Sequence, residues 1–329
     1  AELTVDATLT AEPTTEDVGR VLARIRETDA DGVIAFGGGS AIDTAKSAAI
    51  LALNPGGLPD YEGYERIPQA GLPVIAIPTT AGTGAEVTRG VAVTDPARKV
   101  KMLVMSAKLV PAAAIVDPAP TISMPAAVTA STGLDALTHG IEAYVSRRCY
   151  PLTDALAIDA ITRISGSLLR AYEVPTDLAA REQMALGSLQ AGMAFHNASV
   201  GLVHGMSRPI GAIFHVPHGL SNAMLLPAVM AYSVPGAAER YANIGRAMGA
   251  ASALDSDESA AASAVRAVRN LCSRAEVPTL AAWGIDRKAF RDSTPKMARD
   301  ALASGSPANN PRLASEADIV TLYESVIAI

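Results

Sequence analysis

The first third of the chain alternates short apolar runs, glycine-rich turns and helical patterns. Each run is apolar at consecutive positions, which is typical of strands buried on both faces of a parallel sheet. After the first run, an Ala-rich helical pattern extends from Ala41 to about Leu53. Repeated strand, turn and helix predict a Rossmann-like α/β domain with crossover helices. The three expected strands are Gly32–Phe36, Pro73–Pro78 and Ala112–Pro118.

Beyond Pro125 the pattern changes to long stretches rich in Ala, Leu and Met, and strand-like runs disappear. We therefore expect a boundary near residues 122–126, with an α/β dinucleotide-binding domain over 1–124 and an all-α domain over 125–329. The polar segment Ser304–Arg312 is expected to be a loop before a last helix. Helical periodicity predicts helices over Ala126–Ser146, Thr153–Tyr172, Thr176–Phe195, Gly236–Met248 and Ser259–Cys272.

Composition narrows the class of protein. Of 329 residues, 49% are hydrophobic and 18% charged, which allows a large core and argues against wholesale disorder. The net charge of −6 does not favour nucleic acid as a partner.

We expect no membrane span, because no apolar run reaches about 20 residues. Cys149 and Cys272 form no disulfide framework, and no signal-peptide pattern opens the chain, so a cytoplasmic location is expected. The first residue is not Met, so the chain is expected to begin inside a longer one.

A phosphate-binding turn is expected after the first strand. The segment AFGGGSAIDTAK places three glycines and Ser40 between a strand and a helix, where backbone can approach a ligand and unpaired N–H groups face an anion. The alternative is an ordinary tight turn with Ser40 as the helix N-cap. The segment PTTAGTGAE places Thr79, Thr80 and Thr83 in a second such turn, which strengthens the prediction of nucleotide binding.

Three ionisable residues lie in an otherwise apolar helical stretch. Asp135 and His139 are four residues apart and share a helix face, and Glu142 lies three further on. A carboxylate and an imidazole in this arrangement can chelate a divalent ion, but the spacing taken alone favours the alternative, a buried polar pair that caps or hydrogen-bonds locally.

The histidines are concentrated in one part of the chain. Four of the five lie in a single short window, which indicates a site. Two of them would have to join Asp135 and His139 to hold a metal, and spacing alone does not select the pair. The four are His196, His204, His215 and His218.

The motifs together resemble the iron-containing (group III) alcohol dehydrogenases, of the lactaldehyde reductase and 1,3-propanediol dehydrogenase type. The matching segments are GGGSAIDTAK, IPTTAGTGAEVT, DALTHGIEAY, GLVHGMSRPIG and VPHGLSNAMLLP, in the family's order and spacing over nearly the whole chain. The resemblance implies a dehydroquinate synthase-like architecture with a cleft between the two domains. It also implies one divalent cation, usually Fe(II) and sometimes Zn(II), held by Asp135, His139, His204 and His218, which leaves Glu142 either to support these ligands or to pack beside them.

The resemblance further implies NAD or NADP as the cofactor. Gly38, Gly39 and Ser40 would hold its pyrophosphate, and Phe195 would line the substrate pocket. The other residues implied around cofactor or substrate are Asp43, Lys46, Thr79, Thr80, Thr83 and Lys101. From helical periodicity, Asp43 and Lys46 could face either a ligand or water.

The chain departs from the family pattern in three places. Arg208 stands where relatives often carry His, and His196 and His215 stand where His is unusual. Relatives also have further strands and helices before the position of Ala1, which carry the group that selects NAD or NADP. We expect His196 or His215 to share in moving the alcohol proton, and Arg208 either to bind a substrate carboxylate or phosphate or to form an internal ion pair.

The resulting prediction is a metal-dependent NAD(P) alcohol dehydrogenase or aldehyde reductase for small aliphatic substrates, with the cation acting as a Lewis acid. Relatives commonly form dimers or larger rings, so a homodimer or higher homo-oligomer is expected. The alternatives are a metal-free reductase such as a maleylacetate reductase, a lyase or cyclase of the dehydroquinate synthase kind, and a non-catalytic nucleotide-binding remnant.

Overall fold

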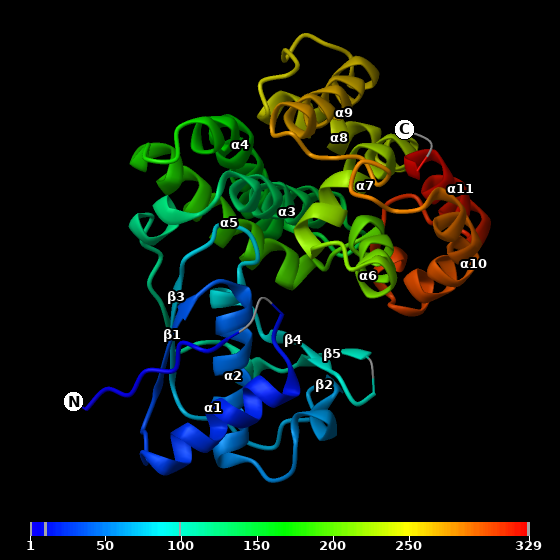
Figure 1. Cartoon of the computed structure of the whole chain (residues 1–329). Helices are drawn as coiled ribbons and strands as arrows, with labels where there is room; N and C mark the ends of the chain where they lie inside the picture. The colour runs from blue at the N-terminus through cyan, green and yellow to red at the C-terminus, as the bar shows by residue number, and fades with distance from the viewer. Residues whose placement is uncertain (1, 10–11, 99, 328–329) are drawn as a thin grey trace. The chain divides into compact units, whose positions relative to one another are not determined.

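The computed structural model describes residues 2–9, 12–98 and 100–327. It divides into two compact units, Ala1–Thr121 and Ile122–Ile329, which we term the α/β unit and the helical unit (Figure 1). The division falls at the edge of the segment 122–126, where the sequence pattern changes.

The α/β unit contains a parallel sheet built from the three predicted runs. Its strand order is β1-β3-β6, from β1 (Val33–Gly37), β3 (Val74–Pro78) and β6 (Ala113–Ala114), and both pairings are parallel. The β1–β3 register aligns Val33 with Val74 and Gly37 with Pro78, so the two strands end side by side. The parallel prediction is confirmed, although the third strand is much shorter than the run that predicted it.

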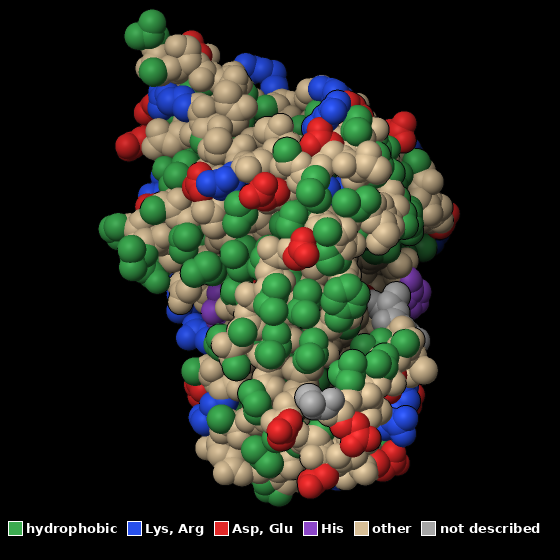
Figure 2. All heavy atoms as spheres, turned by 90° about the vertical axis from the view of Figure 1, so that its left-hand side faces the viewer, with side chains coloured by type: hydrophobic (Ala, Val, Ile, Leu, Met, Phe, Trp, Pro, Cys, Tyr) green, Lys and Arg blue, Asp and Glu red, His purple; other side chains and the backbone are tan. Residues whose placement is uncertain are grey.

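Helix α2 (Gly39–Leu53) covers one face of this sheet. Its apolar residues Ile42, Ala45 and Ala49 form one buried cluster with Ala35 and Val74 of the strands. The opposite face of β1 carries Ile34 and Phe36, which are 56% and 63% exposed. Figure 2 shows apolar side chains gathered on the side of the molecule where β1 and β3 lie.

A second sheet and an N-terminal helix were not predicted. The sheet has the order β2-β5-β4, from β2 (Gly63–Tyr64), β5 (Val100–Met105) and β4 (Gly90–Asp95), and β4 and β5 pair antiparallel. Residues alternate between buried and half-buried along β4, as in a strand with one face in the core. Helix α1 (Thr15–Glu27) begins at a capping box between Thr14 and Asp17. An all-parallel α/β unit was therefore too simple an expectation.

The helical unit confirms the change of pattern after Pro125. The five predicted helices are present as α3 (Ala126–Val145), α4 (Pro151–Glu173), α5 (Leu178–Ala198), α8 (Ala238–Ala247) and α9 (Asp257–Arg274), and the last helix is α11 (Glu316–Ile327). Three more were not predicted: α6 (Leu202–Phe214), α7 (His218–Ser233) and α10 (Arg287–Ala303). The short 3-10 helices are Leu58–Tyr61, Ala85–Val87, Ala107–Leu109, Ala119–Ser123, Val234–Gly236 and Ser306–Asn309.

Helix α3 lies in the core of the helical unit. Its last thirteen residues, from Gly133 to Val145, are all buried. Glycine permits close packing here: a Cβ on Gly140 would lie 3.2 Å from Ile161 of α4. Across the three described stretches, we find no helix that combines the length and apolar character required to cross a membrane.

Candidate metal centre

Helix α3 carries its three ionisable side chains into the core. Asp135, His139 and Glu142 are each 5% exposed or less. The predicted shared face of Asp135 and His139 follows from their i, i+4 spacing on a continuous helix. Three buried ionisable groups are costly unless they are paired or bind an ion, so their partners define the site.

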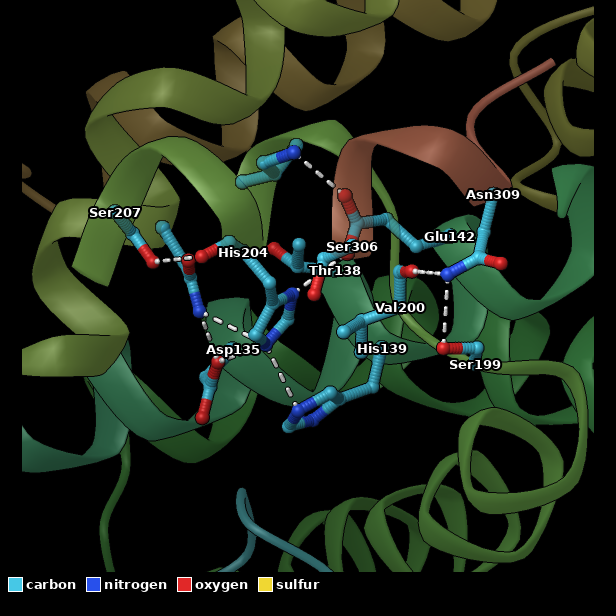
Figure 3. A network of polar contacts seen from close by, with 12 residues as sticks. Asp135, Thr138, His139, Glu142, Ser199, Val200, His204, Ser207, Ser306 and Asn309 are labelled. Carbon is cyan, nitrogen blue, oxygen red and sulfur yellow. Dashed lines mark hydrogen bonds and ion pairs between the residues drawn. The ribbon is translucent and has the colours of Figure 1, made fainter. Parts of the chain in front are cut away.

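Two other helices bring histidines to Asp135, and Figure 3 shows one of them, His204. His204 lies in the first turn of α6 and His218 is the first residue of α7. One ligand atom each of Asp135, His204 and His218 lies within 4.8 Å of the other two. Asp135 Oδ1 lies 3.6 Å from His204 Nε2 and 3.9 Å from His218 Nε2.

His139 and Phe195 adjoin this cluster. His139 Nε2 lies 3.0 Å from His204 Nε2, although His139 is not in the tighter group of three. The Phe195 ring, from α5, stacks on the His139 imidazole with ring centroids 4.1 Å apart. The structure thus gathers the four residues that the resemblance implied as ligands, with Phe195 packed directly against one of them.

Asn222 is a member of this cluster that sequence reasoning missed. Its Nδ2 donates to Asp135 Oδ1 at 2.6 Å and lies 3.1 Å from His204 Nε2 and 3.3 Å from His218 Nε2. Its Oδ1 is buried and has no hydrogen-bond partner among the described residues. The available signal was its position four residues after His218, which places both on one face of α7.

The charges of the cluster suit a divalent cation. Burial alone would raise the pKa of Asp135, but the imidazoles of His139, His218 and His204 outweigh it and hold the pKa well below its usual range. Burial alone would lower the pKa of His204, but Glu142 and Asp135 raise it to about 9. One carboxylate with several imidazole nitrogens is the donor set preferred by Fe(II) and Zn(II), so the residues present fit such an ion.

The remaining predicted residues of the helical unit lie on α5 and at two places along α6. His196 follows Phe195 on α5, and the two rings meet edge to face with centroids 6.1 Å apart. Arg208 lies one turn after His204 on α6, and its Nη1 donates to Ser306 Oγ at 2.9 Å. His215 is exposed and forms the left-handed C-cap of α6, with φ 55°. Ser306 is itself buried in a 3-10 helix, so the expected polar loop over 304–312 is partly an ordered, packed segment.

In the α/β unit, the two predicted turns meet. Thr79 N donates to Gly37 O at 2.9 Å, which joins the ends of β3 and β1. A Cβ on Gly39 would lie 2.9 Å from Thr83 Cγ2, so only glycine lets α2 approach the second turn this closely. Gly38 would likewise place a Cβ 3.3 Å from Thr80 Cγ2. Both turns therefore line the carboxyl edge of the sheet, where parallel sheets bind ligands.

The N-terminus of α2 fits an anionic group. Gly38 is its N-cap and has no side chain with which to cap the helix, while Ser40 lies inside the helix. The alternative of Ser40 as an N-cap is therefore wrong. The N–H groups of the first turn and the positive end of the helix dipole are suited to a pyrophosphate.

Asp43 and Lys46 are both bonded to groups of the α/β unit, with Lys46 buried and Asp43 half-buried. Lys46 is 1% exposed, and its Nζ donates to the carbonyl oxygens of Ala85, Thr88 and Gly90 at 3.1, 2.8 and 2.8 Å. Lys46 thus anchors the segment that follows the second turn. Asp43 Oδ2 accepts from Ala92 N at 2.9 Å, and its Oδ1 is buried without a hydrogen-bond partner.

Lys101, another predicted residue, is close enough for its positive charge to act on Asp43. Lys101 lies on β5, where its Nζ is 3.3 Å from Glu12 Oε2, and its side chain is 45% exposed. Burial raises the pKa of Asp43, against the opposing effect of the Lys46 and Lys101 ammonium groups.

Comparison with known proteins agrees with both parts of this description. The family model "Iron-containing alcohol dehydrogenase" matches residues 1–118, and the model "Fe-containing alcohol dehydrogenase family, C-terminal" matches residues 129–327. The chain is 45% identical over 312 residues to the probable alcohol dehydrogenase EutG of Escherichia coli (strain K12), covering 95% of this chain and 77% of that protein. It is 40% identical over 303 residues to the 1,3-propanediol dehydrogenase of Klebsiella pneumoniae, covering 92% and 77%.

Solved structures give the same result. The crystal structure of a 1,3-propanediol oxidoreductase superposes with a TM-score of 0.95 at 37% identity, covering 99% of this chain and 84% of the other. An alcohol dehydrogenase from Oenococcus oeni superposes with a TM-score of 0.92 at 34% identity, covering 96% and 82%. The chain therefore belongs to the iron-containing alcohol dehydrogenase family and is an oxidoreductase that acts on the CH–OH group with a nicotinamide cofactor.

Proposed function

We propose that Asp135, His139, His204 and His218 hold one divalent cation, Fe(II) in preference to Zn(II). The observation that carries this proposal is the convergence of ligand atoms from α3, α6 and α7 within 4.8 Å of one another. The buried, ionised carboxylate of Asp135 supplies negative charge where a cation would gain most from it. A metal-free reductase would gain nothing from burying this set of charged and polar groups.

When bound, the cation supplies Lewis acidity that stabilises negative charge on the substrate oxygen. The protein's own contribution is to hold the ligands in place and to keep bulk water from the buried side of the site. Asp135, His139 and His204 are each 5% exposed or less, whereas the His218 side chain is 38% exposed. We therefore assign the approach of the substrate to the side of His218, with Phe195 lining the pocket next to His139.

For the cofactor, we assign the pyrophosphate to the N-terminus of α2, at Gly38, Gly39 and Ser40. The hydroxyl groups of Thr79, Thr80 and Thr83 stand at the adjoining turn and suit phosphate or ribose oxygens. The buried, unpartnered Oδ1 of Asp43 suits a hydrogen-bond donor of the cofactor. Lys101 would contribute positive charge beside Asp43. These features suit NAD and NADP equally.

The proton of the alcohol must also leave the site, and we assign its transfer to His196 or His215. His196 is the better placed of the two, because it adjoins Phe195, which contacts His139. Replacement of each histidine by Ala, with the pH–rate profile as the readout, tests this assignment. Two variants that both keep the parent profile would rule it out.

We propose a small aliphatic alcohol or aldehyde as the substrate, in a cytoplasmic homodimer or larger homo-oligomer. The relatives' names include a lactaldehyde reductase of Escherichia coli (strain K12) and an NAD-dependent methanol dehydrogenase of Bacillus methanolicus, which supports small substrates. Arg208, whose Nη1 donates to Ser306 Oγ, would favour a carboxylate or phosphate on the substrate through the other donors of its guanidinium. Comparing neutral with carboxylated aldehydes in Arg208→Ala tests this, because equal losses for both would exclude anion recognition.

The proposed function as a whole is tested by metal depletion and restoration. The protein, purified without oxygen, is treated with a chelator and then given Fe(II) or Zn(II), and hydride exchange between NADH or NADPH and a panel of aldehydes is followed. We expect activity to vanish on depletion and to return with Fe(II). Full activity in the metal-depleted protein would favour the metal-free reductase instead.

A further inference from the structure

We infer that Glu142 is a positioning residue that fixes the ring orientation and the tautomer of His204, and so sets the metal affinity of the site. This inference rests on the proposed metal site, but it concerns a residue outside the four ligands. Glu142 projects from α3 toward the beginning of α6, one turn beyond His139. It is 4% exposed, and His204 is 2% exposed.

Both carboxylate oxygens of Glu142 are engaged by neighbouring groups of α6. His204 Nδ1 donates to Oε2 at 2.6 Å, and Val203 N donates to Oε1 at 2.6 Å. Hydrogen bonds to an ionised acceptor are short and strong, and two of them on one carboxylate fix its plane. A single side chain from another helix therefore fixes both the backbone at the start of α6 and the ring of His204.

The contact with Val203 replaces a missing helix cap. The N-cap of α6 is Gly201, which has no side chain to accept from the first turn. Glu142 accepts there instead, and its negative charge lies at the positive end of the helix dipole. A Cβ on Gly201 would lie 3.2 Å from Glu142 Oε1, so glycine at this position lets the carboxylate approach closely.

The contact with His204 selects which ring nitrogen is available to a cation. An ionised carboxylate can only accept, so Nδ1 carries a proton, and in the neutral imidazole that binds a cation the lone pair is on Nε2. Nε2 is the atom that faces Asp135 Oδ1, His139 and Asn222. Carboxylates bonded to the second nitrogen of a metal-binding histidine orient the ring and raise its basicity.

Glu142→Gln separates positioning from packing, because the two side chains have nearly the same size. The glutamine amide has one oxygen and one NH2 group, but Val203 N–H and His204 Nδ1–H both need an acceptor. The backbone N–H cannot change, so the oxygen turns to Val203 and the NH2 turns to Nδ1. His204 must then accept at Nδ1 and carry its proton on Nε2, which removes the lone pair proposed for the metal.

The matched control is Asn309→Ala. Asn309 Nδ2 donates to Ser199 Oγ and Val200 O, at 3.0 and 3.1 Å, and so supports the same segment before α6 without touching His204. Zn(II) affinity is measured for the full-length wild type and both variants by competition with a chromophoric chelator, after circular dichroism has shown that each is folded. We expect a loss of about 10- to 100-fold in Glu142→Gln and wild-type affinity in Asn309→Ala. A folded Glu142→Gln protein with wild-type Zn(II) affinity would overturn the inference.

A second measurement does not depend on the variant folding. In Zn(II)-loaded wild type with 15N-labelled histidine, only five imidazoles contribute signals, which simplifies assignment. We expect His204 to bind through Nε2 and to show a far-downfield Nδ1–H proton; coordination through Nδ1 would overturn the inference. Failure of wild type to bind Zn(II) or Fe(II) at all would refute the proposed metal site instead, which keeps the two failures distinct.

Discussion

Asn222 donates from its side-chain amide to Asp135 Oδ1 at 2.6 Å, and the same nitrogen lies within 3.3 Å of both His204 Nε2 and His218 Nε2. An uncharged N–H group thus occupies the point on which one carboxylate and two imidazoles converge. Both side chains are buried, with Asn222 0% exposed. The amide therefore orients the Asp135 carboxylate through their hydrogen bond.

The first prediction follows from this contact. Asn222→Ala should lower the affinity for Zn(II) by about tenfold, since the Asp135 carboxylate loses a charge-assisted hydrogen bond worth ~1.5 kcal/mol. The neighbouring Ser221→Ala is the control, because in the part of the chain that the structure describes Ser221 Oγ donates only to the backbone oxygen of His218, at 2.9 Å. Equal effects of the two substitutions would show that the amide has no particular role in the site.

The second prediction concerns the glycine turn. Gly39→Ala should raise the dissociation constant of NADH by about tenfold, which corresponds to ~1.4 kcal/mol. Its new Cβ would lie 2.9 Å from Thr83 Cγ2, and the turn and α2 would have to separate. Gly19→Ala on α1 is the control, since a Cβ there would meet nothing within 4 Å among the described residues outside its own stretch of helix. Fluorescence titration with NADH measures both, and metal content should be unchanged in both.

The third prediction concerns Lys46. Lys46→Met removes the donor shared by three buried carbonyl groups, so the free energy of unfolding should fall by about 2–3 kcal/mol near pH 7. Burial of the ammonium lowers the pKa of Lys46 from 10.5 to about 8, although the negative charges of Asp43 and Glu86 act to raise it. Between these two pH values the unfolded chain binds more protons at this residue than the folded protein, so this contribution to stability rises with pH.

The stability gap between wild type and Lys46→Met should therefore widen from pH 8 to pH 10. Urea unfolding of both proteins at each pH measures the gap, and the subtraction cancels the titration of other groups. A gap that narrows over this range would contradict the assignment of a buried, destabilised ammonium.

The parts of the site that could be predicted are those that depend on local geometry. Asp135 and His139 share a helix face because of their spacing, and the glycine turns follow strands that end at one edge of a parallel sheet. Periodicity could not choose among His204, His215 and His218, because the choice depends on how α6 and α7 pack beside α3. The family motif selected His218, and the structure places it next to Asp135, with His215 exposed at the end of α6.

Other features could not be read from the chain because they oppose local rules. Helices α6, α7 and α10 contain Pro209, Pro227 and Pro295, which normally interrupt a helical pattern. Periodicity left Lys46 facing either a ligand or water. Its ammonium instead donates to carbonyl groups that lie 39, 42 and 44 positions further along the chain. Asn222 carried the same i+4 signal as Asp135 and His139, but an amide does not stand out among candidate ligands.

The most direct test of the metal site is anomalous X-ray diffraction from crystals of the anaerobically purified protein, recorded on both sides of the iron absorption edge. The account predicts one anomalous peak per chain, about 2.0–2.2 Å from a carboxylate oxygen of Asp135 and from one nitrogen each of His139, His204 and His218. An active protein with no anomalous peak among these four side chains, or with its metal bound elsewhere, would contradict it.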